Sequence, residues 1–286
     1  MNIFCGDKVR HPKMLDCGVG KVLDVSADGK ARIFFIDAGE KLLGLKHVNL
    51  ERVESEEDNH PILDNPSLGE QLKDTSFKSL PAAKVDFLRD FPDGFRDEGY
   101  FAEERRYKLD AHNLMHELLS REIFEDLLGS GDYAEICKRA LQVVNKSTLI
   151  FPNEKMALKD GLKIPNSEKL FAQNLFTLLF GEGELKERFE GFCRYLEEIK
   201  AAKWTTATYF LFITFPSKFM FMKPTIAQHA AMLVKAELNY RSELNWLTYK
   251  CLLDFSDYLA KCLTEMDMEP QDMIDVQSFM WCIAPR

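Results

Sequence analysis

Short apolar runs separated by glycines fill the first 53 residues of the chain. The runs are DKVRHP, GVGKVLDVS, ARIFFIDA, GEKLLGL and HVNLERV. Val22 and Val25 lie on either side of Leu23, and residues 33–36 are apolar without a break. Such runs are typical of strands that curl and bury residues from both faces. Five strands in so short a stretch predict a small β-barrel.

Glycines mark the expected turns of this barrel. Asp28-Gly29 predicts a two-residue hairpin turn, because such turns need positive φ angles that glycine adopts without strain. Gly18 and Gly20 stand inside strand patterns, where a missing side chain indicates a bulge or a close backbone approach.

The chain after residue 80 has mostly helical periodicity. In a long helix expected over 105–128, Met115, Leu119, Ile123 and Leu127 form one apolar stripe that ends at Gly129-Ser130-Gly131. Ser167 is the expected N-cap of another helix. The helices expected are 81–90, 105–128, 133–144, 153–162, 167–180, 184–200, 225–238, 247–263 and 271–281.

Residues 203–215 fit two structures. Their aromatic and β-branched content suits a strand, whereas their length suits a buried helix, which we favour. The acidic, Pro-, Asn- and Ser-rich stretch that begins at residue 54 has the composition of a linker. We therefore expect an α+β protein of two parts: a barrel at 1–55, a linker at 56–80 crossed by few contacts, and an α-helical domain at 81–286.

The N-terminal stretch also resembles a known type of domain. Its segments 6–12 (GDKVRHP), 16–22 (DCGVGKV), 33–35 (IFF) and 39–41 (GEK) resemble a short bacterial Tudor-like, SH3-like barrel family. That family is similar to the C-terminal barrels of UvrD/PcrA-type helicases and to CarD-type transcription regulators. Cys17 replaces an expected tryptophan, and the segment 12–18 is longer than in the helicase barrels. The resemblance implies docking onto RNA polymerase or another protein of DNA metabolism, repair or defence. The rest of the chain resembles only uncharacterised bacterial proteins.

Charge is distributed unevenly along the chain. Residues 1–53 contain nine Lys/Arg and seven Asp/Glu, a net charge of +2; the whole chain carries −9, so the remainder carries −11. Because non-specific nucleic-acid affinity comes from neutralised phosphates, an acidic body binds nucleic acid poorly. If the protein contacts nucleic acid, the barrel is the expected surface.

Cysteine usage and hydropathy indicate a cytoplasmic protein. The seven cysteines include no C-x-x-C pair, so neither a disulfide framework nor a zinc ribbon is indicated. The start, MNIFCGDKV, lacks the pattern of a signal peptide. The apolar run at 204–215 is too short for a membrane span, which needs about 20 residues. We expect no membrane association.

The candidate binding surface lies on the barrel. Basic side chains there are interleaved with Asp7, Asp16, Asp24 and Asp37, a mixture that suits a protein partner better than nucleic acid, which stays a second alternative. An aromatic ring among them is expected to stack on a base or to pack on a partner. The predicted binding residues are Lys8, Arg10, His11, Lys13, Lys21, Arg32 and Phe34.

The helical body contains weaker candidates. His112 and His116 have a spacing that can bind one metal, but HEXXH is absent and packing is favoured. Asp272, Asp275 and Gln277 suggest a degenerate nuclease site, yet no partner carboxylate is identifiable, so helix capping and docking is favoured. Lys223, beside an aromatic run, either binds an anion or covers apolar surface with its stem.

The favoured function is therefore a non-enzymatic adaptor. No phosphate-binding loop, nucleophile elbow or Cys-His-Asn pattern occurs in the sequence. The catalytic residues are unknown, and neither a metal nor a cofactor is expected. The alternative from another class is a metal-dependent nuclease or hydrolase whose site lies in the helical body.

Overall fold

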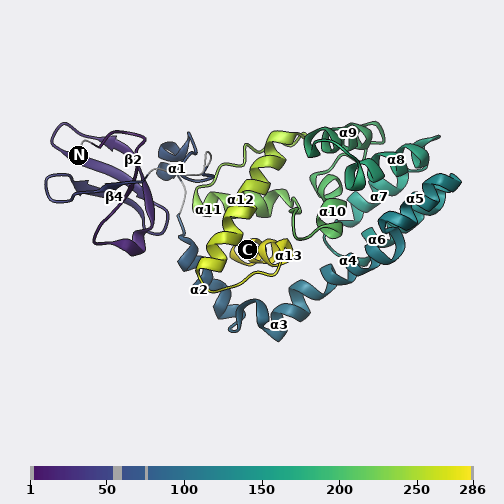
Figure 1. Cartoon of the computed structure of the whole chain (residues 1–286), viewed down its shortest axis with the longest axis horizontal. Coiled ribbons are helices and arrows are strands. Elements are labelled where there is room, and N and C mark those ends of the chain that lie inside the picture. The colour runs from purple at the N-terminus through teal and green to yellow at the C-terminus, as the bar shows by residue number, and fades with distance from the viewer. Residues whose placement is uncertain (1–2, 54–59, 75–76, 285–286) are drawn as a thin grey trace. The chain divides into compact units, whose positions relative to one another are not determined.

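The chain forms an N-terminal antiparallel sheet followed by a mostly helical body (Figure 1). The structure is a computed structural model, and it describes residues 3–53, 60–74 and 77–284. The α+β class expected from the sequence is confirmed. The chain divides into two compact units: Met1–Pro92 with Gln228–Leu238 and Trp281–Arg286, and Asp93–Ala227 with Asn239–Met280. Each unit is described by itself.

The sheet contains all five strands expected from the apolar runs. They are β1 (Lys8–Arg10), β2 (Val19–Val25), β3 (Lys30–Phe35), β4 (Gly39–Gly44) and β5 (Glu51–Arg52). They lie in the order β4-β3-β2-β1-β5, and each neighbouring pair is antiparallel. This arrangement is consistent with a small barrel.

One face of the sheet forms its apolar core. Val9, Val22, Ile33 and Phe35 are fully buried in one cluster on this face. Gly20 lies among them, and a Cβ on it would stand 2.8–2.9 Å from the Phe35 ring, the Ile33 side chain and a backbone oxygen. The expected close approach at Gly20 is therefore present, and no larger residue fits there without moving backbone.

The connection between β2 and β3 differs from the expected two-residue turn. Residues 26–29 form it, and Gly29 has a φ of 83° whereas Asp28 is not among the described residues with positive φ. The Ser26 N–H donates to the Lys30 carbonyl and closes this longer loop. The register shift in β2 lies between Val22 and Asp24, away from Gly18 and Gly20.

The segment expected to be a linker is partly ordered against the sheet. Its residues 54–59 lie outside the described residues. Helix α1 (Leu68–Asp74) follows, then α2 (Leu80–Asp90), which Ser79 caps through its side chain. The Asn65 side chain donates to the Lys235 carbonyl at 3.0 Å, and the Lys78 N–H donates to the Leu233 carbonyl at 2.9 Å. Residues 60–74 and 77–78, which we call the covering segment, thus belong to the first unit. That the barrel and the body unfold separately stays a prediction.

The helices agree with the expected ranges to within a few residues at most ends. The remaining helical elements are two 3₁₀ turns, η1 (Leu15–Cys17) and η2 (Gly94–Arg96), a π-helical turn η3 (Phe101–Arg105), and the helices α3 (Glu98–Tyr100), α4 (Arg106–Leu119), α5 (Arg121–Ser130), α6 (Tyr133–Lys146), α7 (Pro152–Gly161), α8 (Ser167–Phe180), α9 (Leu185–Glu198), α10 (Trp204–Thr214), α11 (Pro224–Val234), α12 (Trp246–Glu265) and α13 (Met273–Ile283).

Two local expectations for the helices were wrong. The helix expected over 105–128 is broken at Ser120, whose ψ of 162° is not helical and whose hydroxyl accepts the Ile123 N–H as the N-cap of α5. Ser167 is the first residue of α8 rather than its N-cap. Asn166 precedes it in the left-handed region, and the Ser167 hydroxyl donates to the carbonyls of Leu162 and Ile164. In both places a serine hydroxyl stabilises a helix start, but at a different position from the expected one.

Helix α10 is the centre of the second unit. All of its residues are buried, and the helix that we favoured over a strand in this stretch is confirmed. Phe210 of α10 packs on Phe171 of α8, and Tyr209 donates its hydroxyl proton to the Val143 carbonyl of α6. Among the described residues, none of the helices combines the length and the apolar character that crossing a bilayer requires.

Candidate functional site

Three of the seven predicted binding residues lie in one row across the sheet. Lys8 of β1 pairs with Lys21 of β2, which pairs with Phe34 of β3. Directly paired residues of an antiparallel sheet point to the same face. This face is opposite to the apolar core formed by Val9 and Phe35.

The covering segment occupies this row. The Lys8 ammonium lies 2.8 Å from Asp64 Oδ2, and the Lys21 ammonium donates to the Asn65 carbonyl at 3.4 Å. The Phe34 ring is fully buried and meets the Phe77 ring edge-on, with centroids 5.1 Å apart. The prediction that the Phe34 ring is presented for stacking on a base or a partner is therefore wrong, because residues of the same chain already bury it.

Two further predicted residues also have partners within the sheet. His11 is 6% exposed, and its Nδ1 accepts the backbone N–H groups of Lys13 and Met14. His11 thus closes the turn after β1 and does not face solvent. Arg32 is half-exposed, and its Nε lies 3.6 Å from Glu40 Oε1 on the neighbouring strand.

Arg10 and Lys13 are the predicted binding residues that stay exposed. Neither forms an ion pair with another described residue. Arg10 ends β1 and Lys13 lies in the β1–β2 connection, where Leu15 begins the 3₁₀ turn η1 (Leu15–Cys17) with a side chain that is 65% exposed. We call Arg10, Lys13 and Leu15 the docking patch. The sequence analysis did not include Leu15 among the binding residues. Its position as an apolar residue between the charged residues Lys13 and Asp16, outside a strand, could have indicated an exposed apolar side chain.

The two histidines of α4 bind backbone rather than a metal. His112 Nδ1 lies 2.7 Å from the Ile213 carbonyl oxygen, and His116 Nε2 lies 3.1 Å from that of Thr214. Both carbonyls belong to the last turn of α10, where a helix leaves its carbonyl oxygens without intrahelical partners. The pair therefore joins the end of α10 to α4, which is the packing role favoured from the sequence.

One arginine pairs with both carboxylates of the tail. Arg105 Nη1 lies 2.8 Å from Asp272 Oδ1, and Nη2 lies 2.8 Å from Asp272 Oδ2. Nη1 also lies 2.6 Å from Asp275 Oδ1. Burial alone would lower the pKa of Arg105, but these two carboxylates outweigh it and raise the pKa. Both aspartates thus serve as partners of a buried cation, and the arrangement explains how α13 docks.

Further polar groups complete this buried cluster. The Tyr100 hydroxyl donates to Asp275 Oδ1 at 2.5 Å, and the fully buried Lys108 donates to the Ser278 hydroxyl at 2.7 Å. Gln277 is 5% exposed, and its Oε1 has no hydrogen-bond partner in the part of the chain that the structure describes. Arg105 ends the π-helical turn η3, a feature that is frequent at functional sites. Here the turn aims the arginine at α13.

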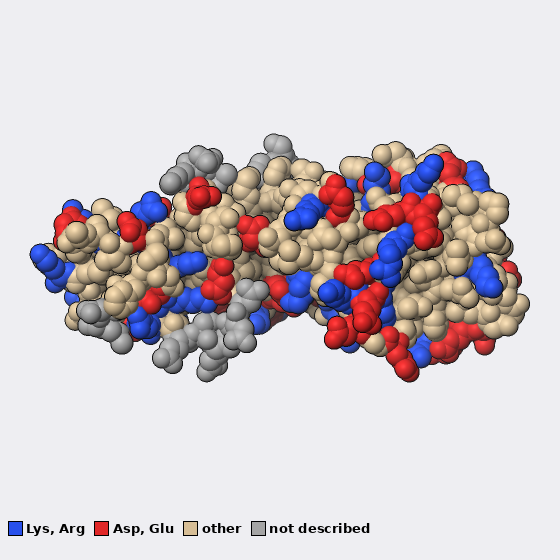
Figure 2. Space-filling model, turned by 90° about the horizontal axis from the view of Figure 1, so that it is seen from above, with Lys and Arg blue, Asp and Glu red and all other residues tan. Residues whose placement is uncertain are grey.

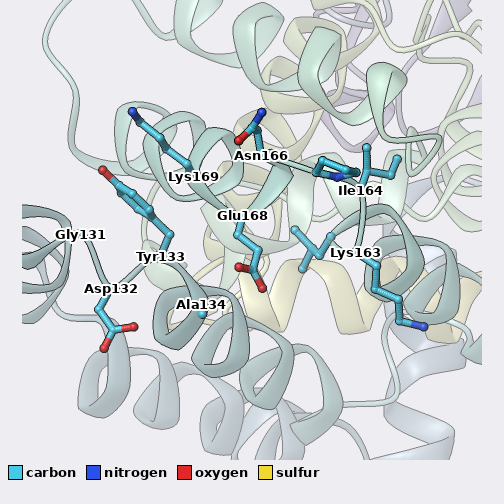
Figure 3. A pocket seen from close by; sticks show the side chains of 11 residues that line it. Gly131, Asp132, Tyr133, Ala134, Lys163, Ile164, Asn166, Glu168 and Lys169 are labelled. Atoms are coloured by element: carbon cyan, nitrogen blue, oxygen red, sulfur yellow. The ribbon is translucent and has the colours of Figure 1, made fainter.

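A cavity of about 590 Å³ opens where α6 and α8 begin. Figure 3 shows Tyr133 and Lys169 side by side at one end, Lys163 at the other and Glu168 between them. The Lys169 ammonium lies 5.9 Å from the centroid of the Tyr133 ring. Because carboxylates and ammonium groups both line the cavity, it favours neither an anionic nor a cationic ligand.

The chemistry of the cysteines depends on burial. Burial, with a contribution from Glu168, raises the pKa of the Cys137 thiol to about 12, and burial likewise raises that of Cys193 to about 12. Cys5 is exposed. The thiolate is the reactive form, so the buried pair has little nucleophilic character.

We therefore expect a thiol reagent at pH 8 to modify Cys5 at least about 100-fold faster than Cys137 and Cys193 in the folded protein. Peptide mapping by mass spectrometry measures the three rates. In urea the rates should converge. Labelling of Cys137 or Cys193 at the rate of Cys5 without urea would show that these thiols are not buried.

No metal-binding cluster is found in residues 3–53, 60–74 and 77–284: no three His, Cys, Asp or Glu side chains there are grouped closely enough to hold an ion.

A family model described as a protein of unknown function (DUF3553) matches residues 4–53, which is the sheet and its connections. No curated protein and no solved structure matches the chain. The family description names no activity.

Proposed function

We propose that the protein is a non-enzymatic interaction protein that docks onto another protein through its N-terminal sheet. The observation that carries the proposal is the docking patch, where two exposed cations without described ion-pair partners lie within five residues of an exposed leucine in the sequence. An exposed apolar side chain beside basic groups suits an acidic protein surface, because apolar contact supplies affinity and charge supplies orientation and association rate.

The class of partner rests on the resemblance to Tudor-like barrels. That resemblance implies RNA polymerase or another protein of DNA metabolism, repair or defence. The covering segment supports a narrow docking site, because it occupies Lys8, Lys21 and Phe34 and leaves the β1–β2 connection open. On the face seen in Figure 2, acidic and basic side chains are interspersed, which suits a protein partner better than a phosphate backbone.

Charge reversal at the docking patch tests the proposal. We expect Arg10→Glu/Lys13→Glu to weaken binding to purified bacterial RNA polymerase by about tenfold or more, since each substitution turns an attraction into a repulsion. Biolayer interferometry at two salt concentrations measures the change, and the loss should be larger at low salt. The matched control is Lys46→Glu, which reverses an exposed charge of the same domain outside the patch.

Two results would overturn the proposal. One is wild-type protein that binds polymerase no better than a sheet-deleted chain. The other is an equal loss of binding free energy per reversed charge for the patch variant, which reverses two charges, and for Lys46→Glu, which reverses one; this would indicate non-specific electrostatics. If a labelled DNA duplex binds with the same dependence on Arg10 and Lys13, the nucleic-acid alternative replaces protein docking.

A further inference from the structure

Helices α6 and α7 of the second unit enclose an open groove of about 520 Å³. Its lining comes from residues of α6 and from residues 152–159 of α7, two helices that are labelled in Figure 1. Three lysines, two amides and three apolar residues make up this lining: Lys138, Lys155, Lys159, Gln142, Asn145, Leu141, Pro152 and Met156. No carboxylate lines the groove.

The ammonium groups are held to different degrees. Lys155 donates to the Ser147 carbonyl at 2.7 Å, and its partial burial lowers its pKa. Lys138 pairs with Glu135 at 3.0 Å on the exposed side of α6. Lys159 is exposed and forms no ion pair with another described residue. Lys159 therefore gives the groove a positive charge that no described carboxylate pairs with, and no carboxylate lies in the lining itself.

Exposed apolar groups accompany these lysines. The Met156 side chain is 55% exposed in the groove, and Phe151, the residue before α7, is 54% exposed. The Lys223 ammonium lies 3.3 Å from the centroid of the Phe151 ring and donates to the Leu149 carbonyl. The ring under the Lys223 ammonium is thus Phe151 rather than a member of the aromatic run before Lys223, and Lys223 lies outside the lining of the groove.

The shape and the lining together identify the class of ligand. On α7 the lining of the groove runs from Pro152 to Lys159, a stretch of about 11 Å of helix. This length matches about two turns of a helix laid along α7. Flexible methionine side chains are common where amphipathic helices bind in grooves.

We propose that this groove binds an acidic amphipathic helix of a partner protein. Its apolar face packs on Leu141 and Met156, and its carboxylates face Lys138 and Lys159. Nucleic acid fits less well, because the lining is partly apolar and the remainder of the body is acidic. The groove and the docking patch belong to different units, so either proposal can fail without the other.

Methionine methyl NMR with a synthetic probe tests the groove. The probe is an 18-residue helical peptide with leucines on one face and glutamates on the other, and the control peptide carries lysines in place of the glutamates. The protein has eleven methionines, and Met156→Leu identifies the Met156 methyl signal. We expect the acidic peptide to shift that signal saturably and the basic peptide to leave it unchanged.

Charge reversal supplies the matched comparison. Lys138→Glu/Lys159→Glu should weaken binding of the acidic peptide at Met156 by about tenfold or more. Lys186→Glu/Lys218→Glu changes the net charge equally at exposed lysines outside the groove and should change the affinity less than about twofold. Circular dichroism confirms that both variants are folded.

Three outcomes would overturn the proposal. The first is that the acidic peptide does not shift the Met156 signal. The second is that both double variants lose affinity equally. The third is that a labelled DNA oligonucleotide shifts the signal at a lower concentration than the peptide does. Arg10→Glu/Lys13→Glu should leave the titration at Met156 unchanged, which separates this site from the docking patch.

Discussion

Arg105→Met is expected to destabilise the second unit by about 3–5 kcal/mol. Removing one partner of a buried ion pair leaves the other charge desolvated and uncompensated, and such losses are of this size. Here two carboxylates lose their partner at once, since Arg105 holds both Asp272 and Asp275 and Asp275 is completely buried. Urea unfolding followed by tryptophan fluorescence and circular dichroism measures the change.

Arg96→Met is the matched control. Arg96 also pairs with a carboxylate near the C-terminus, Glu269, but both side chains are mostly exposed, so its loss should cost less than about 1 kcal/mol. Asp275→Asn should reproduce part of the loss caused by Arg105→Met. Equal stability of the two arginine variants would mean that the cluster does not hold α13 in solution.

Phe34→Ala is expected to destabilise the first unit by about 3–5 kcal/mol, the usual cost of truncating a buried phenylalanine. The ring is fully buried against Phe77, so the substitution opens a cavity between the sheet and the covering segment. Hydrogen exchange of β2 and β3 amides, measured by mass spectrometry, should speed up strongly. The same experiment decides whether Phe34 is a structural residue or a binding residue.

Leu42→Ala controls for position. Leu42 pairs with Arg32 and lies on the same face of the sheet, but its side chain is 64% exposed, so the change should stay within about 0.5 kcal/mol. Phe77→Ala should remove part of the stability that Phe34→Ala removes. In the double variant the two losses should differ from additivity by a coupling free energy of about 0.5–1.5 kcal/mol. Independent effects of the two rings would show that the covering segment does not pack on Phe34.

Local pattern determined most secondary structure of this chain. The strand from Lys30 to Phe35 and the helix from Tyr133 to Lys146 were predictable because each carries its own periodicity and its own end signals. The break at Ser120 was not, since the apolar stripe continues on both sides of it. The hydroxyl of a serine is compatible with a helix interior and with a cap, and only packing selects between them.

The roles of the candidate residues depended on contacts between distant segments. Lys8, Lys21 and Phe34 fall in one row by strand register. Asp64, Asn65 and Phe77 decide that this row is covered. Asp272 and Asp275 looked like an unpaired acidic motif until Arg105 was placed beside them. Periodicity reports which side of an element is buried, whereas the identity of the group that buries it depends on chain segments far away in sequence. The sequence alone therefore determined the α+β layout and the strands and helices, and the tertiary structure decided which charged and aromatic residues remain free to bind.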